Sequence, residues 1–374
     1  MEVCESAGWA SVRRFLPFDL DGLARETGLL TRCRGFASAE DLTRVLLMCA
    51  VPKVSLRTTA DWARQAGLST MGWTGLFQRL RDAEPFLKAC FSETLRNGAG
   101  TGKRTYAGFD LVAVDATVLC GPKATGSDQI LHTVYDIGTG LPRSVEVTDH
   151  HGGENFARHS TFGKGDLVLA DRGYGYKKNV CACLATGARL LVRFEFHCFK
   201  LFDSLTGRPV TVEEAERRLP QNGTVDVSLF APGCDTALRA VGRRTVEGKA
   251  VWLLTDLSRE ELPAEEAHEL YRSRWQVELF FKRTKSLLDL DELPTRDGPT
   301  ARPWIWAKLV LAALATLLGN ERFSPWEQGK IEMEKVLEGT SQDGRRAPGE
   351  LPQVTPKSKA SNNKKTRPKS LLEA

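Results

Sequence analysis

The sequence predicts an α/β protein in which a helical N-terminal region precedes a core of strands and helices. Three observations support this prediction. Residues 1–105 carry helical periodicity, residues 110–175 contain apolar β-branched runs, and residues 188–256 are again rich in strand patterns. The 374 residues suffice for two or three domains, and 41% hydrophobic residues suit a soluble globular protein with a substantial core.

The N-terminal region, residues 1–105, is expected to be all-helical. The stretch SAEDLTRVLLMCAV opens with a Ser-x-x-Asp pattern at Ser38, which is typical of a helix start. The next stretch divides into a helix over 55–66, a stop at Gly67 and a second helix from Ser69 or Thr70 onward. This arrangement is typical of a helix-turn-helix, so the region is a candidate DNA-binding domain. The alternative is a plain helical bundle.

Strand patterns begin after the glycine-rich linker NGAGTGKRTYAG. DLVAVDATVLC, residues 110–120, predicts a buried strand, and residues 131–150 predict two strands joined by a turn at 138–140. Residues 166–175 predict another buried strand that ends in a glycine turn, and NVCACLATGA predicts a helix. Residues 188–257 predict a β-rich segment with one helix at VEEAERRL. A single long helix is then expected from Pro263 to about Leu288.

Composition limits the classes of protein that remain. The first fifteen residues lack a signal-peptide pattern, and the apolar stretch 304–319 is shorter than the ~20 residues needed to span a membrane and contains Lys308. We expect that stretch to be a buried core helix. Nine scattered cysteines without CxxC pairs disfavour a structural zinc site and a disulfide scaffold, and they fit reduced thiols in a cytosol. A cytoplasmic protein without membrane contact is therefore expected.

The C-terminal segment, residues 326–374, is expected to be a flexible basic tail. The net charge of the chain is +5, and from Ser341 onward eight lysine and arginine residues stand against three acids. Such a composition is typical of a solvated end, and binding to a polyanion is the alternative.

The stretch YRSRWQVELFFKRTK, residues 271–285, places polar side chains on one line of a helix. These side chains are Tyr271, Arg274, Glu278 and Lys285. At about 100° per residue they fall within about 60° of one another, beside the apolar stripe that contains Val277 and Phe281. The simplest interpretation is an ion-pair ladder of Arg274 with Glu278 at i,i+4.

Two aspartates change that interpretation. Asp115 and Asp171 each follow an apolar strand pattern, where a carboxylate is costly to desolvate unless it has a partner. Together with Glu278 they would supply three carboxylates, which are ligands that Mg2+ prefers. Two such ions can activate a water and stabilise the leaving oxygen in phosphodiester cleavage. Arg274 and Lys285 would then hold backbone phosphates.

This set of residues resembles the DDE transposases of bacterial insertion sequences, specifically the hairpin-forming insertion-sequence family four. The family carries a Tyr-x2-Arg-x3-Glu-x6-Lys signature, which the polar line of residues 271–285 matches without departure in spacing. The family aspartates match Asp115 in VAVDATVL and Asp171 in LADRGY, and the HGGE of TDHHGGENF is also similar to the family. The resemblance covers about residues 50–320.

The resemblance implies a ribonuclease-H-like catalytic core over 106–187 and 258–325, interrupted by the β-rich insertion 188–257. Asp115, Asp171 and Glu278 would be the catalytic residues and would bind two Mg2+ ions, with Mn2+ able to substitute. The implied reaction is cut-and-paste transposition. A nick leaves a 3′-OH, which attacks the opposite strand to form a hairpin, and reopening frees the element for strand transfer.

The resemblance also implies partners and DNA contacts. The partners would be the terminal inverted repeats of the element and the target DNA, bound by a homodimer in a synaptic complex, in the bacterial cytoplasm at the nucleoid and away from the membrane. Tyr271, Arg274 and Lys285 would contact DNA. Trp252 in VWLLTDL would stack on a flipped base, and the alternative is a core tryptophan in a strand. The rival functions are an inactive DNA-binding protein derived from a transposase, and a metal-dependent nuclease without strand transfer.

Overall fold

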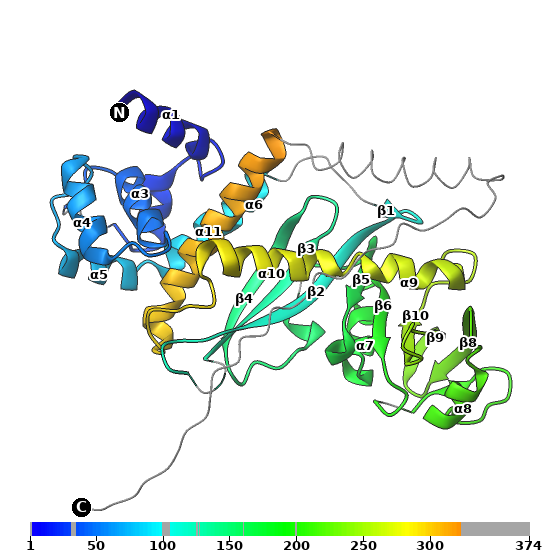
Figure 1. Cartoon of the computed structure of the whole chain (residues 1–374). Helices are drawn as coiled ribbons and strands as arrows, with labels where there is room; N and C mark the ends of the chain where they lie inside the picture. The colour runs from blue at the N-terminus through cyan, green and yellow to red at the C-terminus, as the bar shows by residue number, and fades with distance from the viewer. Residues whose placement is uncertain are drawn as a thin grey trace, which may run out of the picture. The chain divides into compact units, whose positions relative to one another are not determined.

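The computed structural model describes residues 2–30, 35–98, 105–124, 126, 128–159, 161–198 and 200–322. Residues 1–323 form one compact unit, and the described residues of this unit are drawn in colour in Figure 1. The predicted basic tail, 326–374, lies outside the described residues. The predicted domain boundaries inside the compact unit stay predictions.

Six helices precede the sheet in the described part of the chain. They are α1 (Glu2–Arg13), α2 (Leu20–Glu26), α3 (Ala39–Cys49), α4 (Leu56–Gln65), α5 (Trp73–Arg81) and α6 (Glu84–Gly98). The two helices predicted around Gly67 are α4 and α5, and Ser55 caps α4 as its hydroxyl accepts a backbone hydrogen bond. Gly67 has a positive φ of 70°. The second helix begins at Trp73, later than predicted, because Ser69 forms a backbone bridge with Phe36.

A single sheet of ten strands forms the centre of the unit. The strands are β1 (Thr105–Tyr106), β2 (Phe109–Leu119), β3 (Gln129–Asp136), β4 (Leu141–Asp149), β5 (Asp166–Ala170), β6 (Arg189–Phe194), β7 (Phe202–Asp203), β8 (Thr224–Ala231), β9 (Cys234–Arg244) and β10 (Ala250–Thr255). Their order is β4-β3-β2-β5-β6-β10-β9-β8-β7, with β1 beside β2. Strand β5 is parallel to both of its neighbours and buried throughout, as expected of a strand covered on both faces.

The predicted β-rich segment 188–257 contains β6 to β10 and the helix α8 (Val212–Arg218). These strands continue the same sheet, because β10 pairs with β6. Strand β6 itself runs parallel to β5, so it lies with the central strands.

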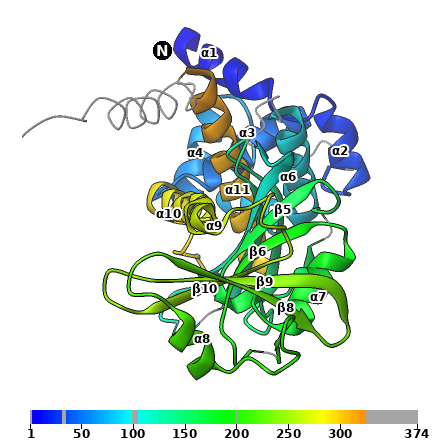
Figure 2. The same ribbon diagram turned by 90° about the vertical axis from the view of Figure 1, so that its right-hand side faces the viewer.

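Helices cover both faces of the sheet. They are α7 (Lys177–Ala185), α9 (Ala264–Arg272), α10 (Trp275–Leu288) and α11 (Gly298–Arg322), and two short 3-10 helices, η1 (Phe156–Arg158) and η2 (Arg172–Tyr174), lie in the connections. Leu111 and Ala113 of β2 share a core with α10, α11 and the N-terminal helices, whereas Val112 and Val114 share another with α7. Figure 2 shows α10 and α7 on opposite sides of the sheet.

Helix α11 contains the apolar stretch that the sequence predicts to be a core helix, and the structure confirms this. By length and composition alone its part Gly298–Gly319 could cross a membrane. In the structure its side chains pack in the core, where the Trp306 ring lies 5.7 Å from the ring of Phe91 on α6. The buried Lys308 donates a 2.5 Å hydrogen bond to the carbonyl oxygen of Asp289, and burial lowers the pKa of its amine. The last helix therefore completes the core of the first ones.

The prediction of one continuous helix from Pro263 to Leu288 is wrong. Helix α9 ends at Arg272 and α10 begins at Trp275. Between them the backbone bonds tighten to i→i+3, from the amide of Arg274 to the carbonyl of Tyr271 (3.0 Å) and from Val277 to Arg274 (3.1 Å). Tyr271 thus belongs to α9, and the helical wheel drawn through the break does not hold for it.

Candidate metal centre

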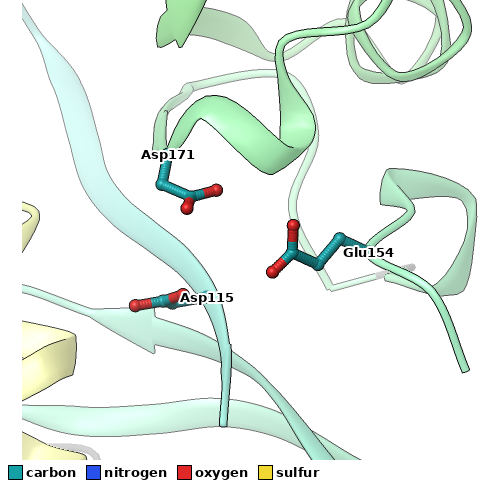
Figure 3. A group of neighbouring side chains, drawn as sticks. All are labelled: Asp115, Glu154 and Asp171. Carbon is teal, nitrogen blue, oxygen red and sulfur yellow. The ribbon is translucent and has the colours of Figure 1, made fainter. Parts of the chain in front are cut away.

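Three acidic side chains from separate segments converge at one end of the central strands. Asp115 lies in β2, Asp171 directly follows β5, and Glu154 lies in the loop after β4. Strands β2 and β5 are parallel neighbours with Val114 opposite Ala170, so the residues that follow this pair come to the same edge. One carboxylate oxygen of each acid lies within 4.8 Å of the others. Figure 3 shows the three side chains as neighbours.

Backbone amides and a glycine hold this arrangement. The amide of Ala116 donates to Asp115 Oδ1 at 2.8 Å, and the amide of Gly173 donates to Asp171 Oδ1 at 2.9 Å. Asp171 thereby caps η2, which fixes its side chain. A side chain at position 173 would overlap the Glu154 carboxylate, so the glycine permits the close approach of Glu154.

Burial and like charge act together on these carboxylates. Burial raises the pKa of Asp115 to about 6, an effect that the Ala116 amide and Arg274 oppose and the charges of Asp171 and Glu278 reinforce. Glu154 is an exposed residue, but partial burial of its carboxyl and then the charges of Asp171 and Asp115 raise its pKa to about 7. A divalent cation relieves such repulsion, and carboxylate oxygens are suitable ligands for a hard cation. The donor set therefore fits a metal of this class.

Arg274 links the third predicted carboxylate to this group. Its Nη1 lies 3.3 Å from Asp115 Oδ2, and its Nη2 forms an ion pair with Glu278 Oε1. Asp115 faces α10 because side chains alternate along β2, and Leu111 and Ala113 pack on that side. Of the predicted set, Asp115 and Asp171 are thus brought together directly, while Glu278 joins them through Arg274. The predicted i,i+4 ion pair is present.

The other two residues of the signature, Lys285 and Tyr271, contact β2 and Arg274 respectively. Lys285 donates from Nζ to the carbonyl oxygen of Val118 at 3.0 Å, which ties α10 to β2. The Arg274 guanidinium lies 5.6 Å from the centre of the Tyr271 ring, and burial raises the pKa of Tyr271 to about 12. The signature residues therefore connect α9 and α10 to the strand that carries Asp115.

Trp252 is placed in the core. Its side chain is only 6% exposed, its ring meets that of Phe196 edge-on at 5.0 Å, and it faces Gly242 across the β9–β10 pair. A Cβ at position 242 would overlap the indole, so the glycine makes room for it. This placement favours the core-tryptophan alternative. Stacking on a base would require the indole to leave this site.

Glu154 is the site residue to which the sequence assigned no role. Its HGGE context suggested the family, but loop residues have no periodicity that could place them beside a strand. The signal that could have found it is an acid next to two glycines in the connection between the two aspartate-bearing strands.

A polar cavity of about 430 Å³ opens beside the acids. It is lined by Glu154, Asp171, Arg172, Gly173, Tyr176, Glu195, His197 and Cys198. Arg172 Nη1 lies 2.5 Å from Glu195 Oε1, and His197 Nδ1 lies 3.2 Å from Glu195 Oε2. Space for a polar ligand is therefore present next to Asp171 and Glu154.

Comparison with known proteins gives this arrangement a family. Residues 106–314 match the model of the transposase DDE domain. The chain is 29% identical over 348 residues to InsL of Escherichia coli (strain K12), named as a transposase for insertion sequence element IS186A, across 82% of this chain and 92% of that protein. It is also 29% identical over 349 residues to the transposase for insertion sequence element IS421 of Escherichia coli, with the same coverage.

Among solved structures, the chain is similar to the piggyBac transposase in a synaptic complex with hairpin DNA. The TM-score is 0.48 at 12% identity, over 83% of this chain and 74% of that one. The transposase DDE domain spans more than half of the present chain and includes both aspartates and the signature helices. The chain therefore belongs to the DDE transposases of insertion sequences, enzymes that cleave and transfer DNA strands.

Proposed function

We propose that this transposase moves its insertion sequence by a cut-and-paste reaction that depends on Mg2+ held by Asp115, Asp171 and Glu278. The observation that carries the proposal is the junction of β2 and β5, where two buried strands bring Asp115 and Asp171 together. Glu278 is linked to Asp115, because Arg274 forms ion pairs with both carboxylates. Two bound Mg2+ ions would supply an activated water and stabilise the leaving oxygen, and Mn2+ is expected to substitute.

The proposed sequence of reactions starts with a nick at the end of the element. Water forms the new bond to phosphorus, and the 3′ oxygen leaves and takes a proton. The freed 3′-OH then attacks a phosphorus of the opposite strand and forms a hairpin, while the bond from that phosphorus to the 3′ oxygen of the flanking DNA breaks and this oxygen takes a proton. A second water reopens the hairpin before strand transfer. The resemblance to insertion-sequence family four supports this order. A nuclease without transfer would instead fail to join pre-nicked ends to target DNA.

We also propose that the five strands β4-β3-β2-β5-β6 are a ribonuclease-H-like core. The first three are antiparallel neighbours and the last two run parallel to β2. Of the insertion predicted over 188–257, only the part from β7 to β10 would then remain, because β6 is assigned to the core. The enzyme would act as a homodimer on paired ends in the bacterial cytoplasm. Light scattering of the chain mixed with end DNA measures that oligomeric state.

Arg274 and Lys285 are proposed to hold phosphates of the strand that bends into the hairpin. A charge-assisted hydrogen bond contributes on the order of 1.5–3 kcal/mol, so Arg274→Ala and Lys285→Ala should slow hairpin formation about 10- to 150-fold. First nicking should be less affected, because the straight duplex needs these contacts less. A gel assay that follows both products over time measures the two rates.

Lys282→Ala is the matched control, since Lys282 is an exposed lysine one turn earlier on α10. A purely structural ion pair predicts a different pattern for Arg274→Ala. It predicts a lower melting temperature and an equal loss in both steps, and that result would remove the phosphate-binding role.

Helices α4 and α5 are proposed to bind the ends of the element. Arg57 and Arg81 are exposed, and Trp73 is 47% exposed with the Arg57 guanidinium 5.9 Å from its ring centre. Arg79 is not proposed to contact DNA, because it donates a hydrogen bond to the carbonyl oxygen of Leu29 at 2.8 Å. The exposed cations and the aromatic ring on this pair of helices suit contacts to DNA.

The double variant Arg57→Ala/Arg81→Ala should bind end DNA at least about tenfold more weakly and show a shallower salt dependence. The test needs the full chain, because α6 and α11 share one core and an isolated N-terminal fragment would expose it. Fluorescence anisotropy with end DNA and random duplex gives both affinities. Arg25→Ala on α2 is the control with the same change of charge, and equal losses in both variants would contradict the role of α4 and α5.

A further inference from the structure

We propose that Glu154 completes the metal site of the DNA-free enzyme, and that Arg274 keeps Glu278 out of this site until a DNA phosphate takes Arg274 over. The inference rests on the proposed metal-dependent function. It adds a fourth acid to the predicted three and assigns Arg274 a second partner. In this proposal Glu154 acts in the DNA-free enzyme, and Glu278 joins the site after DNA binds.

The first support is the position of Glu154 relative to the two aspartates. Its carboxylate forms the group of three with Asp115 and Asp171, with one oxygen of each within 4.8 Å. Glu278 does not belong to that group among the residues that the structure describes. The absence of a side chain at Gly173 leaves the room that the Glu154 carboxylate occupies.

A second, independent observation is the hydroxyl of Tyr174. The side chain is fully buried, and its oxygen has no hydrogen-bond partner within the described residues. Burial raises the pKa of Tyr174, and the negative charges of Glu154, Asp115 and Asp171 raise it further. Tyr174 is the last residue of η2, the short helix that Asp171 caps. Buried hydroxyls nearly always have a partner. A water bound to a cation at the three carboxylates would be such a partner.

The third support is the way in which Arg274 is held. Its side chain is 14% exposed and contacts Asp115 with one terminal nitrogen and Glu278 with the other. Its Nε is buried without a partner in the part of the chain that the structure describes. A guanidinium can form bidentate hydrogen bonds with a phosphate as well as with a carboxylate. Arg274 therefore has two alternative anionic partners, and the exchange of Glu278 for a phosphate would free the Glu278 carboxylate.

The consequence is an order of assembly. Without DNA, the affinity for a divalent cation depends on Asp115, Asp171 and Glu154. When DNA binds, its phosphate competes for Arg274, and Glu278 becomes available to the site. The complete ligand set would then exist only with DNA present, which would restrict cleavage chemistry to the complex.

The experiment measures Mn2+ binding to the full chain by calorimetry and by electron paramagnetic resonance, with and without uncleavable end DNA. In the DNA-free protein, Glu154→Gln should weaken Mn2+ binding about 10- to 100-fold. Glu278→Gln should change the Mn2+ affinity of the DNA-free protein about threefold at most, as expected of a charge that acts at a distance. With DNA bound, Glu278→Gln should weaken binding as strongly as Glu154→Gln. Glu146→Gln on β4 is the matched control.

A second variant keeps the test decisive if Glu154→Gln does not fold. Gly173→Ala leaves every charge in place, but its methyl group would displace the Glu154 carboxylate and lie 3.2 Å from Asp171 Oδ1, so it should weaken Mn2+ binding in the same direction. Wild-type Mn2+ affinity in both variants would overturn the role of Glu154. Equal losses in Glu154→Gln and Glu278→Gln without DNA would overturn the role of Arg274. Failure of the proposed function looks different, because Asp115→Asn would then cleave DNA normally.

Discussion

Asp115→Asn, Asp171→Asn and Glu278→Gln are each expected to lower the rate of strand cleavage by at least about three orders of magnitude. Each variant removes a proposed ligand of ions that stabilise the transition state by several kcal/mol, and about 1.4 kcal/mol corresponds to a factor of ten in rate. Binding of end DNA should remain close to normal, because none of the three acids is proposed to contact phosphate. Single-turnover cleavage in Mg2+ and in Mn2+ measures the loss.

Folding is the control for this series. Burial and neighbouring charges raise the pKa of Asp115 from 3.8 to about 6, so the protonated form is favoured in the folded state. The stability contributed by that protonated group is present at low pH and is lost as the pH rises through about 6. Asparagine stays uncharged, so Asp115→Asn should not lower the melting temperature at neutral pH. Normal cleavage by any of the three variants would refute the metal assignment.

Trp252→Ala is expected to reduce the free energy of unfolding by about 3–5 kcal/mol, because it empties a well-packed core site. The indole is wedged between Phe196 and Gly242, and alanine cannot fill that space. Urea unfolding followed by circular dichroism measures the loss. Trp252→Phe retains part of the ring volume and should lose less.

The base-stacking role of Trp252 gives a separate expectation for the same variant. It predicts nearly unchanged stability and a selective loss of hairpin formation. A destabilisation below about 1 kcal/mol together with slow hairpin formation would favour stacking over the core role. The two outcomes differ in both measurements, so the pair of assays decides between them.

The strands that carry the aspartates could be predicted from sequence because their pattern is local. The run DLVAVDATVLC became β2, and DLVLADRGYG became β5 and its turn. Their proximity could not be derived from periodicity, because it depends on the parallel pairing of β2 with β5. The continuation of the sheet from β6 into β10 depends on contacts between residues far apart in the sequence in the same way.

The features that the sequence missed are set by tertiary contacts. No proline or glycine marks the break between α9 and α10, and Arg274 at that break pairs with Asp115 of another element. Glu154 lies in an irregular loop, so only the folded path of the chain brings it to Asp171. A strand pattern alternates two faces without stating what covers each one. For that reason it could not show that Trp252 points into the core.

The shared core of α6 and α11 has a consequence for the order in which the chain is made. Synthesis releases residues 84–98 long before residues 298–322 leave the ribosome. Phe91 and its apolar neighbours on α6 cannot pack against Trp306 until nearly the whole catalytic region has been translated. The N-terminal helices of a nascent chain therefore lack part of their packing, and they acquire it only after all the acidic residues of the site have been translated. Translation of α11 is thus a physical requirement for the finished N-terminal region.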